Sequence, residues 1–431
     1  MDIIELYELY KKFPSVQTDS RNLKPNDIFF ALKGKNFNGN QFAKQAIDNG
    51  AAYAVIDEKV LIDFGIEIAE KIILVDDVLI TLQQLANHHR RQFDIPFLAI
   101  TGSNGKTTTK ELIHAVLSAT FKTYTTEGNL NNHIGVPLTI LRIRDDAEIA
   151  VIEMGANHVG EIASYCQISL PTHGVITNCG KAHLEGFGDM EGVKKGKGEL
   201  YDHLRKNRGT AFVMWDYDYL RSMSHDIPEI IKYGTANADV VGTVLETDPF
   251  LYVKTKDSTV LSSIKTNFVG EYNLPNVLAA VAVGKYFKVS EEKIKAAIEN
   301  YFPSNNRSQL IEHGSNKIIL DAYNANPSSM KLAIENLAHL KAENKVLVLG
   351  DMAELGTDSL QEHQGIVDLV RKFQWKEVLL VGIEFSKTKH NFHFCENTEA
   401  AKQWLQQQHF ENTYILIKGS RNSRMEKVLE D

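Results

Sequence analysis

The chain has 431 residues, with 43% apolar and 24% charged side chains and a formal net charge of −8. This length exceeds what one core supports, so two or three domains of ordinary globular composition are expected. No apolar run is long enough to cross a membrane, no basic stripe suits nucleic acid, and the acidic start lacks a secretory signal, which predicts a cytosolic protein without membrane insertion or a nucleic-acid partner.

The first segment of the chain, residues 1–93, alternates short apolar runs with helix-like stretches. The apolar runs lie at 28–32, 53–56 and 72–75. Runs of this length, separated by stretches with helical periodicity, are typical of a mixed sheet and helix unit. We therefore expect a small α/β domain.

Residues 94–308 show the pattern of buried parallel strands followed by helices. The strand-like runs lie at 97–100, 149–152 and 174–177, and a long helix is expected at 193–204. This alternation predicts a mostly parallel, doubly wound central sheet.

Residues 309–431 form a second alternating segment. Its apolar runs at 317–320, 345–349, 378–381 and 414–417 predict a Rossmann-like domain. The chain is therefore expected to be a three-domain α/β protein. We also expect a monomer, because no coiled-coil pattern or long apolar face requires a partner.

The loop after the run 97–100 carries the residues of a phosphate site. Gly102 and Gly105 permit a tight path in which backbone N–H groups at a helix start face anionic oxygens. The usual pattern has a glycine where Ile100 stands, and a glycine turn capped by threonines is the alternative, but the preceding strand and the following amphipathic helix favour phosphate. The nucleotide-binding residues of this loop are predicted to be Gly102, Ser103, Asn104, Gly105, Lys106, Thr107 and Thr108.

Further residues of this segment suit a magnesium-nucleotide site. Lys106 would reach the β and γ phosphates of ATP, and the Thr107 hydroxyl would ligate Mg²⁺. Glu153 ends an apolar run, as a metal-binding carboxylate would, although a helix-cap partner or an exposed glutamate is equally open. His183 follows the next run, and a lone loop histidine is more often structural, so only its company with Glu153 favours a ligand.

Four segments resemble, in order and spacing, those of the Mur ligases of peptidoglycan synthesis, and the match spans nearly the whole chain. They are residues 101–108, 153–157, 183–188 and 271–276. Within the family, three more segments are similar to those of the members that add D-alanyl-D-alanine, namely 321–330, 350–356 and 418–421. The resemblance implies that residues 1–93 bind the UDP-sugar substrate, 94–308 bind ATP, and 309–431 bind the incoming dipeptide and close over ATP.

The resemblance implies an ADP-forming amide ligase that joins D-alanyl-D-alanine to a UDP-N-acetylmuramoyl tripeptide through an acyl phosphate. Lys106, His183 and Lys197 would be catalytic. Thr107, Glu153, His183 and Lys197 would hold Mg²⁺, and the resemblance implies two ions. Lys197 stands fourteen residues beyond His183, where similar enzymes carry a lysine carbamylated by CO₂, which requires a partly buried lysine able to lose its proton. Otherwise it belongs to a solvated helix face.

Other positions carry family roles by the same resemblance. Asn273 and Asn276 would hold adenine, although either could instead cap the helix expected at 277–287. Arg307 and Asp321 would approach the phosphates and ribose, with surface salt bridges as the alternative. Residues predicted to bind the substrates are Ser20, Arg21, Asn38, Asn131, Asn132, Asn157, Tyr323, Asn324 and Asn326.

Three other functions compete with this prediction. One is a sibling ligase that adds another amino acid or dipeptide. The second is a P-loop ATPase or kinase of unrelated role, and the third is a nucleotide-binding regulatory module without turnover.

Overall fold

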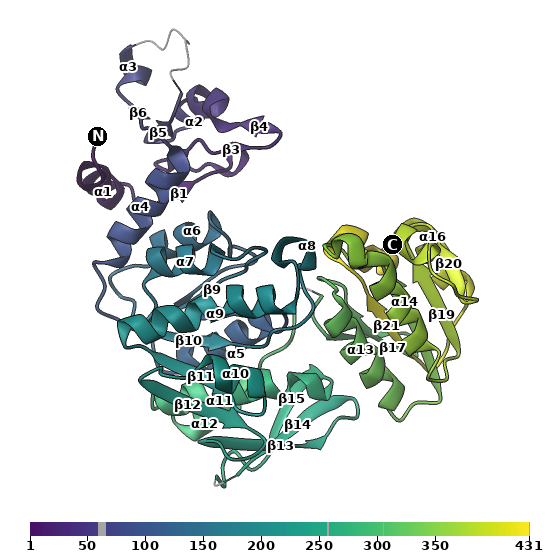
Figure 1. Ribbon diagram of the computed structural model, residues 1–431. Helices are drawn as coiled ribbons and strands as arrows, with labels where there is room; N and C mark the ends of the chain where they lie inside the picture. The colour runs from purple at the N-terminus through teal and green to yellow at the C-terminus, as the bar shows by residue number, and fades with distance from the viewer. Residues whose placement is uncertain (59–65, 257, 305, 431) are drawn as a thin grey trace. The chain divides into compact units, whose positions relative to one another are not determined.

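The computed structural model describes residues 1–58, 66–256, 258–304 and 306–430 (Figure 1). The chain divides into two compact units. Unit 1 consists of Met1–Ala99, Phe121–Gly155 and Glu161–His173, and unit 2 consists of Ile100–Thr120, Ala156–Gly160 and Gly174–Asp431. Among the described residues, none of the helices is both long and apolar enough to cross a bilayer.

Unit 1 contains a four-stranded parallel sheet with the strand order β1-β2-β5-β6. Its strands are β1 Val16–Gln17, β2 Ile28–Phe30, β5 Tyr53–Ile56 and β6 Ile72–Leu74. A small antiparallel hairpin joins β3 Lys33–Gly34 to β4 Phe37–Asn38. The helices of unit 1 are α1 Ile3–Lys12, α2 Ala43–Asp48, α3 Ile66–Ala69, α4 Val78–Arg90, α6 Gly135–Leu141 and α7 Glu161–Ser169.

Packing between α1 and α4 in unit 1 rests on a buried histidine. Nδ1 of His89 lies 3.0 Å from the Tyr7 hydroxyl, and its Nε2 lies 2.9 Å from the carbonyl oxygen of Ile143. Because a carbonyl only accepts, Nε2 carries a hydrogen. Burial lowers the pKa of His89 and so favours the neutral imidazole, in which Nδ1 accepts from the Tyr7 hydroxyl.

The central sheet has nine strands in the order β15-β14-β13-β12-β11-β10-β7-β9-β8. The pairs β11/β12, β12/β13 and β8/β9 are parallel, and β13/β14 and β14/β15 are antiparallel. Its strands are β7 Phe97–Thr101, β8 Thr123–Thr125, β9 Ile149–Glu153, β10 His173–Ile176, β11 Thr210–Met214, β12 Glu229–Gly234, β13 Val240–Glu246, β14 Phe250–Thr255 and β15 Ile264–Val269.

A six-stranded sheet forms the last part of unit 2, with the order β16-β17-β21-β18-β19-β20. The β16/β17 pair is antiparallel, and the other neighbouring pairs, β17/β21, β18/β21, β18/β19 and β19/β20, are parallel. Its strands are β16 Gln309–His313, β17 Asn316–Asp321, β18 Asn344–Gly350, β19 Glu377–Val381, β20 His393–Cys395 and β21 Thr413–Lys418. One apolar core includes Ile318, Val346, Leu379 and Ile417 from four of these strands.

The helices of unit 2 fall into two groups, one that packs against the central sheet and one that packs against the six-stranded sheet. Those of the central part are α5 Lys106–Ser118, α8 Leu184–Phe187, α9 Met190–Asn207, α10 Asp218–Met223, α11 Leu274–Tyr286 and α12 Glu291–Glu299. Those of the last part are α13 Pro327–His339, α14 Ser359–Val370, α15 Ile383–Ser386 and α16 Thr398–Gln407. Short 3₁₀ turns follow the last strand at η5 Arg421–Ser423 and η6 Met425–Leu429.

Every apolar run predicted as a strand is a strand in the structure, with bounds that differ by one or two residues. The helix expected at 193–204 is longer and forms α9. The sequence analysis did not predict β11 to β15. For β13 the reason is that its outer half is largely exposed and lacks a continuous apolar run, whereas β11 is buried along its whole length and was missed despite its apolar residues.

Candidate active site

Two glycines give the phosphate loop its path between β7 and α5. Gly102 has φ 144° and Gly105 has φ 77°, a region that side-chain-bearing residues rarely adopt. A Cβ at Gly102 would lie 2.0 Å from the Thr177 hydroxyl, and one at Gly105 would lie 2.7 Å from Oδ1 of Asn276. The loop therefore needs glycine at both positions, and it ends at the N-terminus of α5.

The segment after β10 braces this loop through hydrogen bonds. The backbone N–H groups of Ser103 and Asn104 donate to the carbonyl oxygen and Oδ1 of Asn178, at 2.9 and 3.0 Å. The Ser103 hydroxyl donates to the Gly180 carbonyl and accepts from the Gly180 N–H, at 3.0 and 2.9 Å. The Thr177 hydroxyl donates to the Asn104 carbonyl at 2.6 Å. These bonds fix the loop against the segment that follows β10.

Lys106 and two threonines occupy the first turn of α5. The Lys106 ammonium donates to the carbonyl oxygens of Gly102 and Ser103, at 2.8 and 3.2 Å, so its charge lies over the loop. Thr107 is buried and Thr108 is half-buried. These positions suit a lysine that contacts phosphate and a hydroxyl near the helix start.

Asn273 and Asn276 lie beside the phosphate loop. The Asn276 amide donates to Oδ1 of Asn273 at 3.0 Å, and its Oδ1 accepts from the Thr109 hydroxyl at 3.0 Å. Asn273 occupies the position before α11 but makes no side-chain capping bond, and its amide donates to the Val269 carbonyl at 3.0 Å. Asn273 therefore does not cap α11 through its side chain. Each of the two amide nitrogens uses one hydrogen in these bonds and keeps a second hydrogen for a ligand.

His183 and Glu354 form an ion pair within unit 2. Both residues have left-handed backbones, with φ 54° and 63° respectively. The N–H of Glu185 donates to the Glu354 carbonyl at 3.3 Å. The hydrogen bond from His183 lowers the pKa of Glu354 below its usual value. Non-glycine residues in this conformation are uncommon and cluster at functional sites. The conformation and the ion pair together make His183 and Glu354 candidates for a functional site.

Lys197 lies in the middle of α9 and is only 1% exposed. Its ammonium donates to the Ala156 carbonyl at 2.9 Å and lies 4.9 Å from the centre of the Phe187 ring. By contrast, Lys194 pairs with Glu191 at 2.6 Å and Lys195 is exposed. The burial that carbamylation requires is met at Lys197, while its two neighbours are solvated as predicted.

Glu153 ends β9 in unit 1 and is 1% exposed, so it is not the surface glutamate that the sequence left open. Its Oε1 accepts from the Asn131 amide at 2.8 Å, and its N–H donates to the Thr126 hydroxyl at 3.0 Å. Asn132 instead accepts from the N–H groups of Ile134 and Gly135. Asn131 therefore orients a buried carboxylate, whereas Asn132 stabilises a turn.

The described residues contain no group of three or more His, Cys, Asp or Glu side chains arranged to hold a metal ion. Two of the predicted ligands, Thr107 and Lys197, are a threonine and a lysine and so lie outside these four residue types. The metal set therefore stays a prediction.

Side chains from the segment before β16 and the loop after β21 gather around Tyr323, which follows β17. The Arg307 guanidinium stacks 3.6 Å from the centre of the Tyr323 ring, and that of Arg421 lies 5.9 Å from it. Nε of Arg307 is buried without a hydrogen-bond partner among the described residues. Asp321 does form the alternative salt bridge, with Nζ of Lys418 at 2.5 Å. Arg307 stacks instead of pairing and keeps donors for a ligand.

Two asparagines that follow β17 connect separate parts of unit 2. Asn324 accepts from the backbone N–H of Arg421 at 3.3 Å. Asn326 caps α13 by accepting from the Ser329 N–H, and its amide donates to Oδ1 of Asn104 at 2.8 Å. The predicted substrate residues of this segment are thus joined to the phosphate loop.

The remaining predicted substrate residues make local bonds. Arg21 forms a two-pronged pair with the carboxylate of Asp19, and these hydrogen bonds lower the pKa of Asp19 to about 2. Ser20 begins the same 3₁₀ turn. Asn38 accepts from Asn40 at 3.0 Å, and Asn157 is exposed.

Sequence reasoning gave no role to Glu354, to Arg421 or to the bracing residues Thr177 and Asn178. Glu354 and Arg421 belong to segments already quoted for their resemblance, which was the available signal. Their partners lie far away in the sequence, so spacing could not reveal them.

The comparisons with known proteins agree along the whole chain. Residues 12–90 match the family model "Mur ligase family, catalytic domain", residues 100–284 match "Mur ligase middle domain", and residues 306–421 match "Mur ligase, glutamate ligase domain". A UDP-N-acetylmuramoyl-tripeptide–D-alanyl-D-alanine ligase of Bacillus subtilis is 33% identical over 96% of this chain and 92% of its own length. The chain belongs to the Mur ligase family.

Two further comparisons describe what this Mur ligase is similar to. The corresponding ligase of Escherichia coli is 35% identical over 96% of this chain and 92% of its own length. The crystal structure of MurF ligase from Thermotoga maritima, solved in complex with ADP, superposes with a TM-score of 0.86 at 27% identity and covers 96% of both chains. The Mur ligase is an ATP-dependent, ADP-forming ligase, and the predicted three-domain α/β class is confirmed.

Proposed function

We propose that this Mur ligase joins D-alanyl-D-alanine to a UDP-N-acetylmuramoyl tripeptide during peptidoglycan synthesis. The observation that carries the proposal is the similarity, over 96% of the chain, to ligases named for this activity, at 33% and 35% identity. It acts as a monomer in the cytoplasm, with small-molecule substrates and no nucleic-acid partner. Residues 1–93 bind the UDP-sugar, 94–308 bind ATP and 309–431 bind the dipeptide.

The reaction proceeds in two steps. An oxygen of the tripeptide carboxylate attacks the γ-phosphorus of ATP, and ADP leaves. The amine of the dipeptide then attacks the carbonyl carbon of the acyl phosphate, loses a proton and expels phosphate. The first step brings a carboxylate to negative phosphate oxygens, and the second develops negative charge on the carbonyl oxygen beside the phosphate, so a site that concentrates positive charge lowers both barriers.

The residues of the phosphate loop fit a nucleotide. Gly102 and Gly105 let the backbone pass closely beside Thr177 and Asn276, and α5 begins directly after the loop, where a helix N-terminus suits phosphate oxygens. Lys106 moves from the loop carbonyls to the phosphates, and Asn273 and Asn276 offer amide hydrogens to adenine. Arg307 and Asp321 contact the phosphates and ribose.

The chemistry of the donor set fits magnesium, which supplies charge neutralisation at the transferring phosphate when bound. Thr107, Glu153, His183 and carbamylated Lys197 would hold it. Glu153 is a buried carboxylate, and Lys197 is buried enough for its amine to react with CO₂ once it has lost a proton. Ser20, Arg21, Asn38, Asn131, Asn132, Asn157, Tyr323, Asn324 and Asn326 contact the two substrates.

The decisive experiment measures phosphate release over a matrix of UDP-muramoyl peptides and amines, with the mass of each product. Release that requires both the tripeptide and D-alanyl-D-alanine is expected. Preference for another amine would identify a sibling ligase, steady ADP formation without either substrate would identify an ATPase, and tight ATP binding without turnover would identify a binding module.

The metal and carbamate proposals have their own tests. Lys197→Ala is expected to abolish ligation, and near-normal activity would remove Lys197 from the mechanism. Glu153→Ala and His183→Ala are each expected to raise the magnesium concentration required for activity. An unchanged requirement in either variant would exclude that residue as a ligand.

A further inference from the structure

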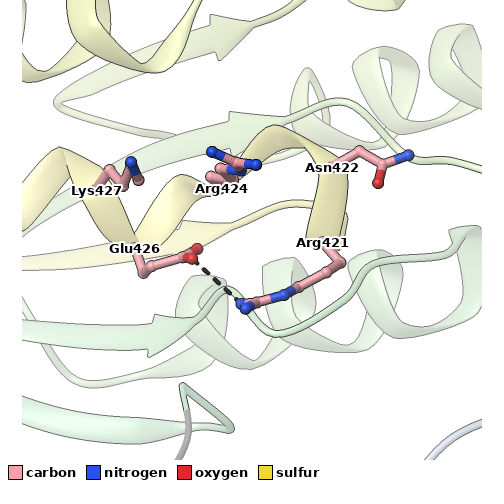
Figure 2. Close-up of a pocket in the computed structure, with 5 residues that line it drawn as sticks. All are labelled: Arg421, Asn422, Arg424, Glu426 and Lys427. Atoms are coloured by element: carbon pink, nitrogen blue, oxygen red, sulfur yellow. Dashed lines mark hydrogen bonds and ion pairs between the residues drawn. The ribbon is translucent and has the colours of Figure 1, made fainter. Parts of the chain in front are cut away.

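A pocket of about 560 Å³ lies in the loop after β21 and is lined by Arg421, Asn422, Arg424, Glu426 and Lys427 (Figure 2). We call it the basic pocket. Its volume is within the ~300–1,000 Å³ typical of small-molecule sites. The lysine-glycine-serine-arginine segment that ends at Arg421 belongs to the family resemblance, yet the proposed function leaves it without a role.

The charges of the basic pocket favour an anion. Figure 2 shows one ion pair, in which the Arg421 guanidinium donates to Oε1 of Glu426 at 3.2 Å. Arg424 and Lys427 form no ion pair with any described residue. Two positive charges are therefore left over. A cavity lined by unpaired cations attracts a ligand of opposite charge.

Arg421 has donors to spare for such a ligand. Its side chain is 63% exposed and gives one bond to Glu426, whereas a guanidinium has five N–H donors in a planar fork. That fork matches the two oxygens of a carboxylate. Glu426 is only 18% exposed, so it is the fixed member of the pair and sets the direction of the Arg421 side chain.

Contacts within unit 2 link Arg421 to the residues already predicted to bind substrate. Its backbone N–H donates to Asn324, and its guanidinium lies 5.9 Å from the Tyr323 ring. Two residues beyond Asn324, Asn326 donates to Asn104 in the phosphate loop. The basic pocket therefore belongs to the same group of loops as the site of phosphate chemistry.

We propose that Arg421 binds the carboxylate of the incoming dipeptide, with Glu426 as a positioning residue and Arg424 and Lys427 adding attraction. This inference rests on the proposed function. Only the amine of the dipeptide reacts, so its carboxylate passes through the reaction unchanged and needs a partner once water is excluded. A phosphate group is the less fitting anion, because the phosphate loop already offers backbone N–H groups to phosphates.

The test compares D-alanyl-D-alanine with its C-terminal carboxamide, which keeps the amine and lacks the charge. For the unaltered chain, the KM of the carboxamide is expected to be about 10- to 100-fold higher, the range for a charged hydrogen bond. Arg421→Gln is expected to raise the KM of the dipeptide by a similar factor and to leave the KM of the carboxamide unchanged. Arg421→Lys should fall between, because it keeps the charge and loses the fork.

Glu426→Gln tests the positioning role. It is expected to raise the KM of the dipeptide severalfold without changing that of the carboxamide, an effect that general destabilisation would not produce. Lys372→Gln is the matched control, because Lys372 is an exposed cation after α14 and should leave both values unchanged. Thermal unfolding of each variant identifies any that fails to fold, and Arg421→Lys then carries the comparison.

The outcomes separate this inference from the proposed function. No dipeptide-dependent ADP release by the unaltered chain would refute the proposed function itself. Normal release combined with an unchanged preference for dipeptide over carboxamide in both Arg421 variants would overturn only the role of Arg421. Loss of that preference in either folded variant supports it.

Discussion

The phosphate loop and the loops around Tyr323 are built on opposite principles. Around Gly102 and Gly105 the ligand-facing groups are backbone N–H donors, fixed by hydrogen bonds to the segment after β10. Around Tyr323 the ligand-facing groups are charged side chains. Arg307 and Arg421 lie against the Tyr323 ring, and Arg421 also forms an ion pair with Glu426. The first region therefore depends on the space around each glycine, and the second depends on charge.

This difference predicts how each region responds to change. A backbone cradle tolerates salt and pH but fails when a single methyl group is added where the chain cannot move. A charged cluster tolerates small changes of volume but fails when one member of a buried pair is removed. The following variants test the contrast, from the largest expected effect to the smallest.

Lys418→Met removes the cation that pairs with Asp321. Lys418 is 2% exposed and Asp321 is 16% exposed, so the variant leaves a largely buried carboxylate without its partner. The free energy of unfolding is expected to fall by about 3–5 kcal/mol. Urea unfolding measures it, with Lys372→Met as an exposed control expected to stay within about 0.5 kcal/mol. A loss below about 1 kcal/mol would contradict the claim that the region around Tyr323 depends on its charged pairs.

Gly102→Ala adds a methyl group to the backbone-built region. The new Cβ would meet the Thr177 hydroxyl at 2.0 Å in a conformation with φ 144°, so the loop must deform. ADP binding is expected to weaken by about 2–3 kcal/mol, or roughly 30- to 150-fold. Calorimetry with ADP measures this affinity. Gly365→Ala is the control, because a Cβ there meets nothing within 4 Å in α14, and it should bind ADP normally.

His89 extends the contrast to a contact that depends on protonation without any ion pair. Burial lowers its pKa below 6.5, so the unfolded chain binds a proton more readily than the folded chain. The contribution of neutral His89 to the free energy of unfolding is then fully present above about pH 6.5. It falls as the pH drops below that value, by at most about 1.4 kcal/mol per pH unit. Unfolding midpoints of unit 1 between pH 7 and 5 measure this. His89→Gln should flatten the curve, whereas the exposed His409→Gln should not.

Glu354→Gln tests a partly exposed ion pair, for which the smallest effect is expected. The pair with His183 is 45% exposed on the glutamate side, so its loss is expected to cost no more than about 1 kcal/mol. Amide hydrogen exchange in α8 should accelerate by a few-fold, as its segment loses a contact. Unchanged exchange would show that the Glu185 N–H bond to the Glu354 carbonyl holds this segment by itself.

The burial of Lys197 was implied by the family resemblance, whereas local patterns were sufficient to predict strands such as β5, β7 and β18 and the glycine loop after β7. They also predicted that Lys195 is solvated. They could not predict that Asn273 precedes α11 without capping it, or that Arg307 stacks on Tyr323 instead of pairing with a carboxylate. These outcomes depend on competition among distant partners, and a one-dimensional pattern does not contain the distances that decide it.

The bond between Asn326 and Asn104 joins residues 222 positions apart in the sequence. Closing so long a loop is entropically unfavourable, so the bond forms late in folding and reports the assembled state. A ¹⁵N-labelled side-chain amide at Asn326 would therefore give a single resonance that follows two events. It would appear as the chain completes its folding, and it would shift whenever a ligand displaces the amide from the phosphate loop.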